Sequence, residues 1–390
     1  MKIGIDARFL THPQMGGFKT YSENLVAGLA NVDADNEYIL YLDRPPSQKT
    51  LLPNRSNFTS CIVPGLVPGL GMPWREQVGL ARQIRRDNLD LFHALTLTAP
   101  LYLSCPLVLT IHDMIWSFPE RFASKKSRSA KRKFMEWYYR LVPRFAARQA
   151  AAIVAVSQAS KESIVQHLGL EEDHVFVTHE AASPIYRQVD DAQQIEKIRR
   201  QYELPDKFVL AIGSADPRKN ITTLLKAYAL LPVAIREEYK LAVVWTHEFL
   251  ETELAELVAE LGLSKYVQFL RQVSNEDLVL VYNAASLFVF PSLYEGFGLT
   301  LLEAMACGAP VVAADNSSIP EIIDDAALLV NALDAEAMAG AIRRILTDKI
   351  LRSSLTQKGL VRATSFSWDR CARQTIGVYE KAVGNCSVDK

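Results

Sequence analysis

Two glutamates separated by a glycine turn are the residues of this sequence best suited to chemistry. Glu295 and Glu303 lie in the segment 291–310, which reads PSLYEGFGLTLLEAMACGAP. The segment follows a short apolar run, passes through Gly296 and Gly298 and continues with the pattern of a helix. The first amides of a helix lack intrahelical partners and carry partial positive charge, so such a turn favours a phosphate group. We therefore expect an anion-binding turn where the chain enters the helix, with close backbone approach at Gly296 and Gly298 and free amides around Leu299 and Thr300.

The two carboxylates themselves suit the recognition of hydroxyl groups. A carboxylate in the turn, such as Glu295, accepts hydrogen bonds from sugar hydroxyls, and one on the helix, such as Glu303, reaches a ribose diol. The alternative is that Glu295 is a loop charge and Glu303 a solvated helix residue. The helix is rich in apolar side chains, however, and a buried acidic residue is seldom without a partner. We therefore interpret both glutamates as site residues.

A second segment, 211–220 with the sequence AIGSADPRKN, joins a strand, a glycine turn and a basic pair ahead of a helix. Arg218 and Lys219 at this helix entrance suit a diphosphate leaving group, on which negative charge develops as its bond breaks. The alternative is a charged loop beside a helix cap. Taken with the glutamates downstream, the pattern predicts that Lys219 binds phosphate.

Two features of the first half extend the candidate site. Gly16 and Gly17 open a helix soon after the first strand, although a Gly-Gly turn is usually only a turn. His112 follows the apolar run 107–111, although a lone histidine at a strand end is more often structural. We expect His112 to be functional and regard His93, at the end of another strand, as a weaker candidate.

The elements that must position these residues follow a repeated alternation of strands and helices. Continuous apolar runs indicate parallel sheets covered on both faces. Strand–helix alternation gives right-handed βαβ units, so we predict an α/β fold with two Rossmann-like doubly wound domains. Ligands of such sheets bind beyond the carboxyl ends of the strands, here in a cleft between the domains. Strands are expected at 2–6, 38–42, 89–93, 107–111, 152–157 and 175–178, and again at 208–212, 240–244, 267–269, 287–290, 310–313 and 327–330.

The boundary between the domains is expected near residues 182–194, where Ser183-Pro184 interrupts regular structure. One amino-terminal domain then covers residues 1–184, and a second domain covers residues 185–367. A final helix at 368–385, with Ser367 or Asp369 as its cap, is expected to cross back onto the first domain.

Composition indicates an ordinary globular protein of 390 residues with a net charge of −1, which does not favour nucleic acid as a partner. The five cysteines form no CxxC pair, and the chain enters a strand at once, so we expect reduced thiols and a cytoplasmic location. No apolar run approaches the roughly 20 residues that span a bilayer. Asp33-Ala34-Asp35 has the spacing of a metal-binding DxD but follows a helix in a polar turn, so we expect neither a metal nor another cofactor.

A basic run at Lys125–Lys133 places six cations in nine residues, and aromatic residues follow it at 137–139. One interpretation is a solvated helix face. The other is a surface for anionic lipid head groups or a polyprenyl-diphosphate acceptor, on the inner face of the membrane.

Glu295 and Glu303, with Gly-Phe-Gly between them and Met-Ala-Cys-Gly-Ala-Pro-Val-Val after them, resemble the E-x7-E motif of retaining glycosyltransferase family four. The resemblance covers nearly the whole chain and implies the GT-B fold. It assigns Glu295 to donor-sugar hydroxyls, Glu303 to the nucleotide ribose, and the amides at Phe297–Thr300 to sugar and diphosphate. Lys219 matches the family's phosphate-binding lysine, whereas Ser214 stands where many members carry an arginine.

The same resemblance implies that Gly16 and Gly17 approach the donor phosphates and that His112 lies near the donor sugar. Arg218 is our hypothesis for the charge that Ser214 does not supply. The resemblance also implies retention of anomeric configuration by a same-face route, in which the departing diphosphate helps to deprotonate the acceptor hydroxyl. The Pro-Arg-Lys-Asn turn resembles bacterial mannosyltransferases of surface-glycan synthesis, so GDP-mannose is the first expected donor and a UDP-hexose the second. A nucleotide-sugar 2-epimerase and a non-catalytic nucleotide-sugar-binding subunit remain alternatives.

Overall fold

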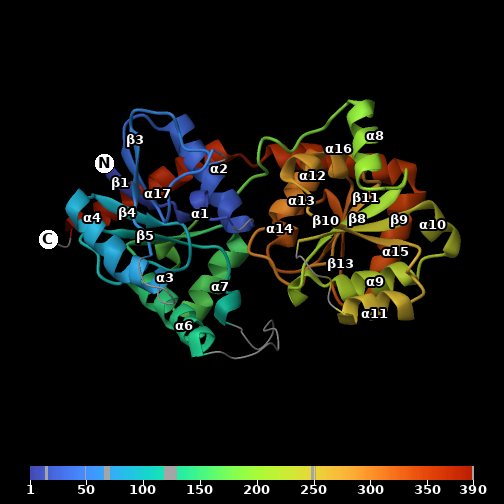
Figure 1. The fold of residues 1–390 in the computed structure, drawn as a ribbon, viewed down its shortest axis with the longest axis horizontal. Helices are drawn as coiled ribbons and strands as arrows, with labels where there is room; N and C mark the ends of the chain where they lie inside the picture. Colours follow the sequence, from blue (N-terminus) through green and yellow to red (C-terminus); the bar gives the residue numbers. More distant parts are fainter. Residues whose placement is uncertain are drawn as a thin grey trace. The chain divides into compact units, whose positions relative to one another are not determined.

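The computed structural model describes residues 1–13, 16–48, 50–65, 71–117, 130–246, 250 and 252–388. The chain forms two compact units (Figure 1). The first consists of Met1–Glu180 together with Ser367–Lys390, and the second of Ala181–Phe366. Each unit contains its own parallel sheet with helices on both faces, which confirms the predicted α/β class.

Within its described residues the first unit has a seven-stranded parallel sheet in the order β3-β2-β1-β4-β5-β6-β7. The order reverses between β1 and β4, where Ile3 pairs with Leu91, and a doubly wound sheet offers its binding crevice at such a reversal. The strands are β1 (Lys2–Asp6), β2 (Glu37–Leu42), β3 (Phe58–Ile62), β4 (Leu91–Ala94), β5 (Leu107–Ile111), β6 (Ala152–Ala155) and β7 (Val175–Val177).

Helices cover both faces of this sheet. Figure 1 shows α2 and α17 on one face and α4, α6 and α7 on the other. Ser157 caps α7 by accepting a hydrogen bond from the amide of Ser160. The helices are α1 (Arg8–Thr11), α2 (Gly17–Val32), α3 (Gly71–Trp74), a π-helical turn (Arg75–Leu80), α4 (Ala81–Asp87), α6 (Ala130–Gln149), α7 (Gln158–Leu168) and α17 (Trp368–Val388), with 3-10 turns at Ile115–Ser117 and Glu172–His174.

The second unit repeats this plan with a six-stranded parallel sheet among its described residues, in the order β10-β9-β8-β11-β12-β13. The reversal falls between β8 and β11, where Phe288 pairs with Leu210. Every residue of β8, β11 and β12 is buried, as expected for central strands covered on both faces. The strands are β8 (Phe208–Gly213), β9 (Lys240–Trp245), β10 (Val267–Arg271), β11 (Leu287–Phe290), β12 (Val311–Ala314) and β13 (Ala327–Val330).

In this unit α9, α11 and α15 pack on one face of the sheet, and α8, α12, α13 and α16 lie on the other (Figure 1). Aspartates or a serine cap several of these helices, among them Asp191 on α8 and Ser274 on α12. The helices are α8 (Ala192–Gln201), a 3-10 turn (Pro217–Lys219), α9 (Ile221–Ala229), α10 (Val233–Glu238), α11 (Thr252–Glu260), α12 (Asn275–Ala284), α13 (Leu299–Ala306), α14 (Ile319–Ile323), α15 (Ala335–Thr347) and α16 (Lys349–Thr364).

The expected strands are all present, each within two residues of its predicted bounds, but β3 was not expected. It is an edge strand in which only Phe58 is buried. Its central Thr-Ser-Cys lacks the continuous apolar run from which the other strands were predicted. The final helix begins where predicted and continues to Val388 rather than ending at residue 385.

The carboxyl-terminal helix α17 returns to the first unit, as predicted, and packs along α2. Ser367 caps it by accepting a hydrogen bond from the amide of Arg370. The two helices approach so closely that a Cβ at Gly28 would lie 2.8 Å from the carbonyl oxygen of Trp368, so this contact requires a glycine.

Candidate active site

The glycine turn of the second unit connects the carboxyl end of β11 to the amino end of α13. Gly298 has a φ of 107°, a conformation that residues with a side chain rarely adopt, and it directly precedes the helix. The turn is anchored from the segment before α14. Ser318 donates to the carbonyl oxygens of Glu295 and Phe297, at 3.0 Å and 2.8 Å, and Ser317 accepts from the amide of Glu295. Sequence reasoning missed the role of these serines, which lie about 20 residues downstream of the turn.

The helix that follows carries Glu303 on its buried face. Its side chain is only 6% exposed, and the hydroxyl of Tyr282 donates to its Oε2 at 3.3 Å. Burial raises the pKa of Glu303 to about 7, against smaller opposing effects of Tyr282 and Lys219. Glu303 is therefore a buried carboxyl with a hydrogen-bond donor, Tyr282, beside it. A partner of this kind was expected from the sequence for a buried acidic residue.

Lys219 and Glu295 lie together although 76 residues separate them in sequence. The Nζ atom of Lys219 is 2.7 Å from Oε1 of Glu295 and 5.3 Å from the centre of the Phe290 ring. Lys219 ends the turn after β8, and Glu295 lies in the turn after β11. These two strands flank the reversal of strand order, so the predicted phosphate and sugar residues meet at the crevice of this sheet.

Asn220 joins the same two turns, and sequence reasoning missed it. Its backbone has a φ of 51°, and its side-chain amide donates to the carbonyl oxygens of Pro291 and Ala332 at 2.9 Å and 2.7 Å. Asparagine tolerates this left-handed conformation better than most residues. It thereby fixes the turn that carries Lys219 against the turn that carries Glu295.

Arg218 pairs with a carboxylate of its own turn. Its Nε and Nη2 atoms donate to Oδ2 of Asp216 at 2.8 Å and 2.6 Å, while Oδ1 of Asp216 accepts from the backbone amide of Arg218. Burial alone would raise the pKa of Asp216, but hydrogen bonds and charge from Arg218 lower it. Ser214 accepts from the amide of Asp216 through its hydroxyl and helps to shape the turn. That Arg218 binds donor phosphate remains a prediction.

In the first unit, Gly16 precedes α2 with a φ of 137°, and Gly17 begins the helix. A Cβ at either glycine would meet no described heavy atom within 4 Å. As far as the described residues are concerned, a ligand can therefore approach the backbone here. The next residue, Phe18, lies edge-on to the His112 ring, with 5.0 Å between centres. The glycine turn and His112, both predicted from sequence, are thus neighbours at the carboxyl edge of this sheet.

His112 is held at both ring nitrogens. Nδ1 is 3.1 Å from Oε1 of Glu180, and Nε2 is 3.1 Å from the carbonyl oxygen of Leu95. Both partner atoms are hydrogen-bond acceptors, and the tautomer of the ring decides which nitrogen donates. The two contacts hold the ring in one orientation, and Glu180 is a partner that sequence reasoning missed.

His93 does not line this edge and is corrected to a structural residue. It is fully buried, with Nδ1 bonded to the hydroxyl of Tyr379 on α17 and Nε2 to that of Thr110. Burial, with a smaller effect of His112, lowers its pKa to about 3. Asp33 likewise has a structural role, because its carboxylate accepts from the amides of Asp35 and Asn36 and closes the turn before β2.

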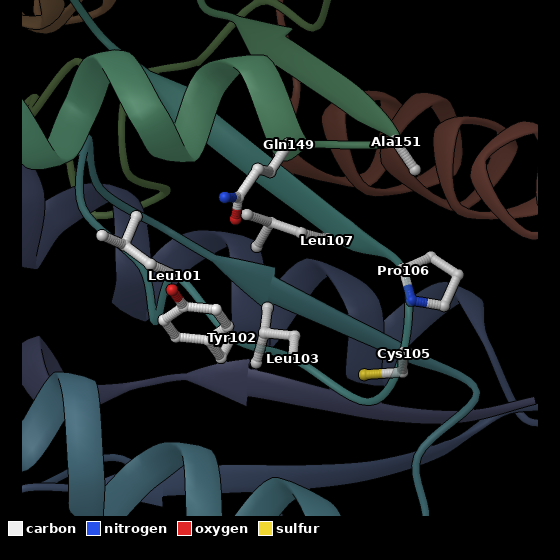
Figure 2. A pocket seen from close by; sticks show the side chains of 8 residues that line it. All are labelled: Leu101, Tyr102, Leu103, Cys105, Pro106, Leu107, Gln149 and Ala151. Carbon is white, nitrogen blue, oxygen red and sulfur yellow. The ribbon is translucent and has the colours of Figure 1, made fainter.

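One pocket of the first unit lies at the opposite end of its sheet, at the amino ends of β5 and β6 (Figure 2). None of the predicted site residues lines it. Its lining residues are Leu101, Tyr102, Leu103, Cys105, Pro106, Leu107, Gln149 and Ala151.

No group of three or more His, Cys, Asp or Glu side chains among the described residues is placed to hold a metal ion. None of the helices found there combines the length and apolar character needed to cross a membrane. The basic run at 125–133 lies largely outside the described residues: 125–129 are not described, and of 130–133 only the helical backbone is.

Two family models match the chain, one in each unit. Residues 15–182 match Glycosyltransferase Family 4, and residues 194–362 match Glycosyl transferases group 1. The O-antigen chain mannosyltransferase B of Escherichia coli is 34% identical over 274 residues, which are 70% of each chain. The serotype-specific mannosyltransferase WbdA of Escherichia coli is 31% identical over 272 residues, 69% of this chain, but this chain spans only 32% of its length.

A solved structure agrees in fold. Anabaena HepE, crystallised with UDP and glucose, superimposes with a TM-score of 0.74 at 22% identity, covering 97% of this chain and 99% of that one. Such low identity supports the fold and nothing finer. The sheets, the carboxyl-terminal helix and the matches in both units show that this chain is a GT-B glycosyltransferase and belongs to the group 1 glycosyl transferases with a family 4 amino-terminal domain.

Proposed function

We propose that this enzyme transfers mannose from GDP-mannose to a glycan or lipid-linked acceptor in surface-polysaccharide synthesis, with retention of anomeric configuration. The names of the curated relatives support mannose as the sugar. A UDP-hexose, the second donor expected from the sequence, is the second candidate.

The observation that carries the proposal is the cluster of Lys219, Glu295 and Glu303 beside the strand reversal of the second unit. We assign the donor diphosphate to Lys219 and the first amides of α13, where cationic and dipolar groups stabilise a departing anion. Glu295 then accepts from hydroxyls of the donor sugar, and Glu303 from the ribose. Donor binding therefore has to break the Lys219–Glu295 ion pair, after which each side chain has a separate part of the donor as its partner.

In the first unit, we assign Gly16, Gly17 and His112 to the region of the donor sugar and acceptor. The double hydrogen bonding of His112 argues for an orienting or charge-stabilising role. The acceptor proton goes to the departing diphosphate in this scheme, so the protein needs no mobile base of its own.

A thermal-shift and calorimetric panel of GDP, UDP, ADP and their sugar conjugates tests the proposal. A ligand that binds only the native state raises stability with the logarithm of its concentration over its dissociation constant. We expect stabilisation by GDP and GDP-mannose that Glu303→Ala abolishes and the surface change Glu256→Ala leaves intact. Stabilisation by UDP and UDP-sugars alone would identify a UDP-sugar, rather than GDP-mannose, as the donor. Turnover of UDP-N-acetylglucosamine without acceptor would indicate an epimerase, and no response to any nucleotide would favour a non-catalytic subunit.

We also propose that the first unit binds an anionic membrane surface through α6. Phe134, Trp137 and Phe145 are 38%, 57% and 49% exposed on this helix, and Arg144 and Arg148 lie exposed among them. Exposed aromatic rings interleaved with arginines suit the boundary between acyl chains and anionic head groups. The sequence adds the basic run at 125–133 just before these residues.

Sedimentation with phosphatidylglycerol vesicles tests this surface. Trp137→Ser with Phe145→Ser should release the protein from the vesicles, as should charge reversal at Lys131, Arg132 and Lys133. Tyr102→Ser is the matched control, because Tyr102 is 88% exposed elsewhere in the same unit. Retention of binding and of lipid-acceptor activity in both sets of variants would reject the membrane surface.

A further inference from the structure

The chain passes between the two units twice, after Glu180 and after Phe366. Glu180 and Tyr186 flank the first passage, and Phe366 and Trp368 flank the second; each contacts a candidate site residue or a partner of one. Between these flanking residues Pro184, Ile185 and Ser367 are exposed, whereas Ala181 is buried. The flanking residues themselves pack within their own units.

In the second unit, Phe366 and Tyr186 contact residues that support the glycine turn and Glu303. The ring of Phe366 lies edge-on to Phe297 of the glycine turn, with 5.9 Å between centres and an angle of 82°. The guanidinium of Arg362 is 4.8 Å from the centre of the same Phe366 ring. Tyr186 packs edge-on against Tyr282 at 6.0 Å, and Tyr282 is the hydroxyl donor to Glu303.

In the first unit, Glu180 contacts His112 directly, and Trp368 contacts it through Tyr21. Oε1 of Glu180 is 3.1 Å from Nδ1 of His112. Trp368 contacts Tyr21 at 5.8 Å, and Tyr21 in turn lies edge-on to His112 at 4.6 Å with an angle of 86°. Aromatic rings prefer such edge-on geometry, so these contacts help to fix the orientation of the His112 ring.

We infer that the two passages brace the candidate site, and that Glu180, Tyr186, Phe366 and Trp368 are positioning residues for the transfer reaction. Phe366 holds the glycine turn through Phe297, and Tyr186 holds the Tyr282–Glu303 pair. Only Ser367 separates Phe366 from Trp368. The expected effect of these residues on turnover rests on the proposed function.

Hydrogen exchange of the unliganded chain tests the brace without any substrate. Phe366→Ala should speed exchange of the amides at 296–301 at least about fivefold, whereas peptides from β8 and β12 keep wild-type rates. Phe366→Tyr should restore the slow rates, and Val361→Ala, on the exposed side of α16, is the matched control. Unchanged exchange at 296–301 in Phe366→Ala would overturn the inference.

Kinetics then separates positioning from general loss of structure. Phe366→Ala should lower kcat about tenfold while guanosine or uridine, which lacks the diphosphate, binds within about twofold of wild type, because Phe366 contacts the phosphate turn and not the ribose carboxyl. Tyr186→Ala should instead weaken GDP or UDP binding, because its support reaches Glu303. Equal losses of binding and turnover in both variants would contradict the assignment. A wild-type chain that binds neither nucleotide would count against the proposed function, while the exchange experiment would still decide the brace.

Discussion

Glu303→Gln should make the unliganded protein more stable above neutral pH while weakening nucleotide binding. The ordinary pKa of a glutamate, 4.5, applies in the unfolded chain, whereas burial raises the pKa of Glu303 to about 7 in the native state. A carboxyl whose pKa is raised on folding favours the native state at low pH, and this contribution is lost as pH rises through the native pKa. Glutamine has the same shape and no charge, so it avoids the loss.

The magnitude follows from the size of the shift. Each pKa unit corresponds to about 1.4 kcal/mol, so the full advantage of Glu303→Gln is about 3 kcal/mol above pH 8 and falls to about 1 kcal/mol at pH 5. For a domain of this size, about 1 kcal/mol moves Tm by roughly 2–4 °C. The variant should therefore melt well above wild type at pH 8 and only slightly above it at pH 5.

Differential scanning calorimetry without nucleotide at both pH values measures this difference, with Glu256→Gln on the exposed face of α11 as the control. A Tm difference that is absent at pH 8, or that is equal at the two pH values, would refute the reasoning. The same variant should lose most of its stabilisation by GDP, because a neutral amide cannot replace a carboxylate that accepts two ribose hydroxyls.

Three further predictions concern the turns at the strand reversal. Lys219→Gln should lower transfer at least about 100-fold and leave Glu295 without its cation, and turnover near wild type would exclude Lys219 from leaving-group stabilisation. Arg218→Ala should lower turnover about tenfold if the guanidinium leaves Asp216 for phosphate, and unchanged turnover would show that Arg218 serves only its own turn. Gly298→Ala should destabilise the second unit by about 1–3 kcal/mol in urea unfolding, because its φ of 107° strains any residue with a Cβ; a change under about 0.5 kcal/mol would contradict this.

The sheets could be predicted from the sequence because central parallel strands are continuous apolar runs. Leu107–Ile111 and Leu287–Phe290 were predicted with their observed bounds for this reason. The edge strand Phe58–Ile62 could not be, because one exposed face and one neighbour leave little apolar signal. Burial of Glu303 was also predictable, since the helix around it is apolar.

The pairing within the site was beyond sequence reasoning. Adjacent strands bring Lys219 and Glu295 to one edge, but their ion pair depends on tertiary distances that no local pattern encodes. The same holds for Asn220, whose amide reaches carbonyl oxygens 71 and 112 residues away. His93 was misplaced because its neighbour on α17, Tyr379, lies 286 residues later.

The return of α17 to the first unit also sets the order in which the chain can finish folding during synthesis. Tyr379, Cys371 and Ala382 are fully buried there, so the part of one sheet face that α17 covers stays exposed until this helix has left the ribosome. The second unit is continuous in sequence and can complete its sheet before that helix is made. The half of the enzyme that is translated first is therefore the half that folds to completion last, and a nascent chain stalled after Phe366 would expose the apolar face that α17 covers.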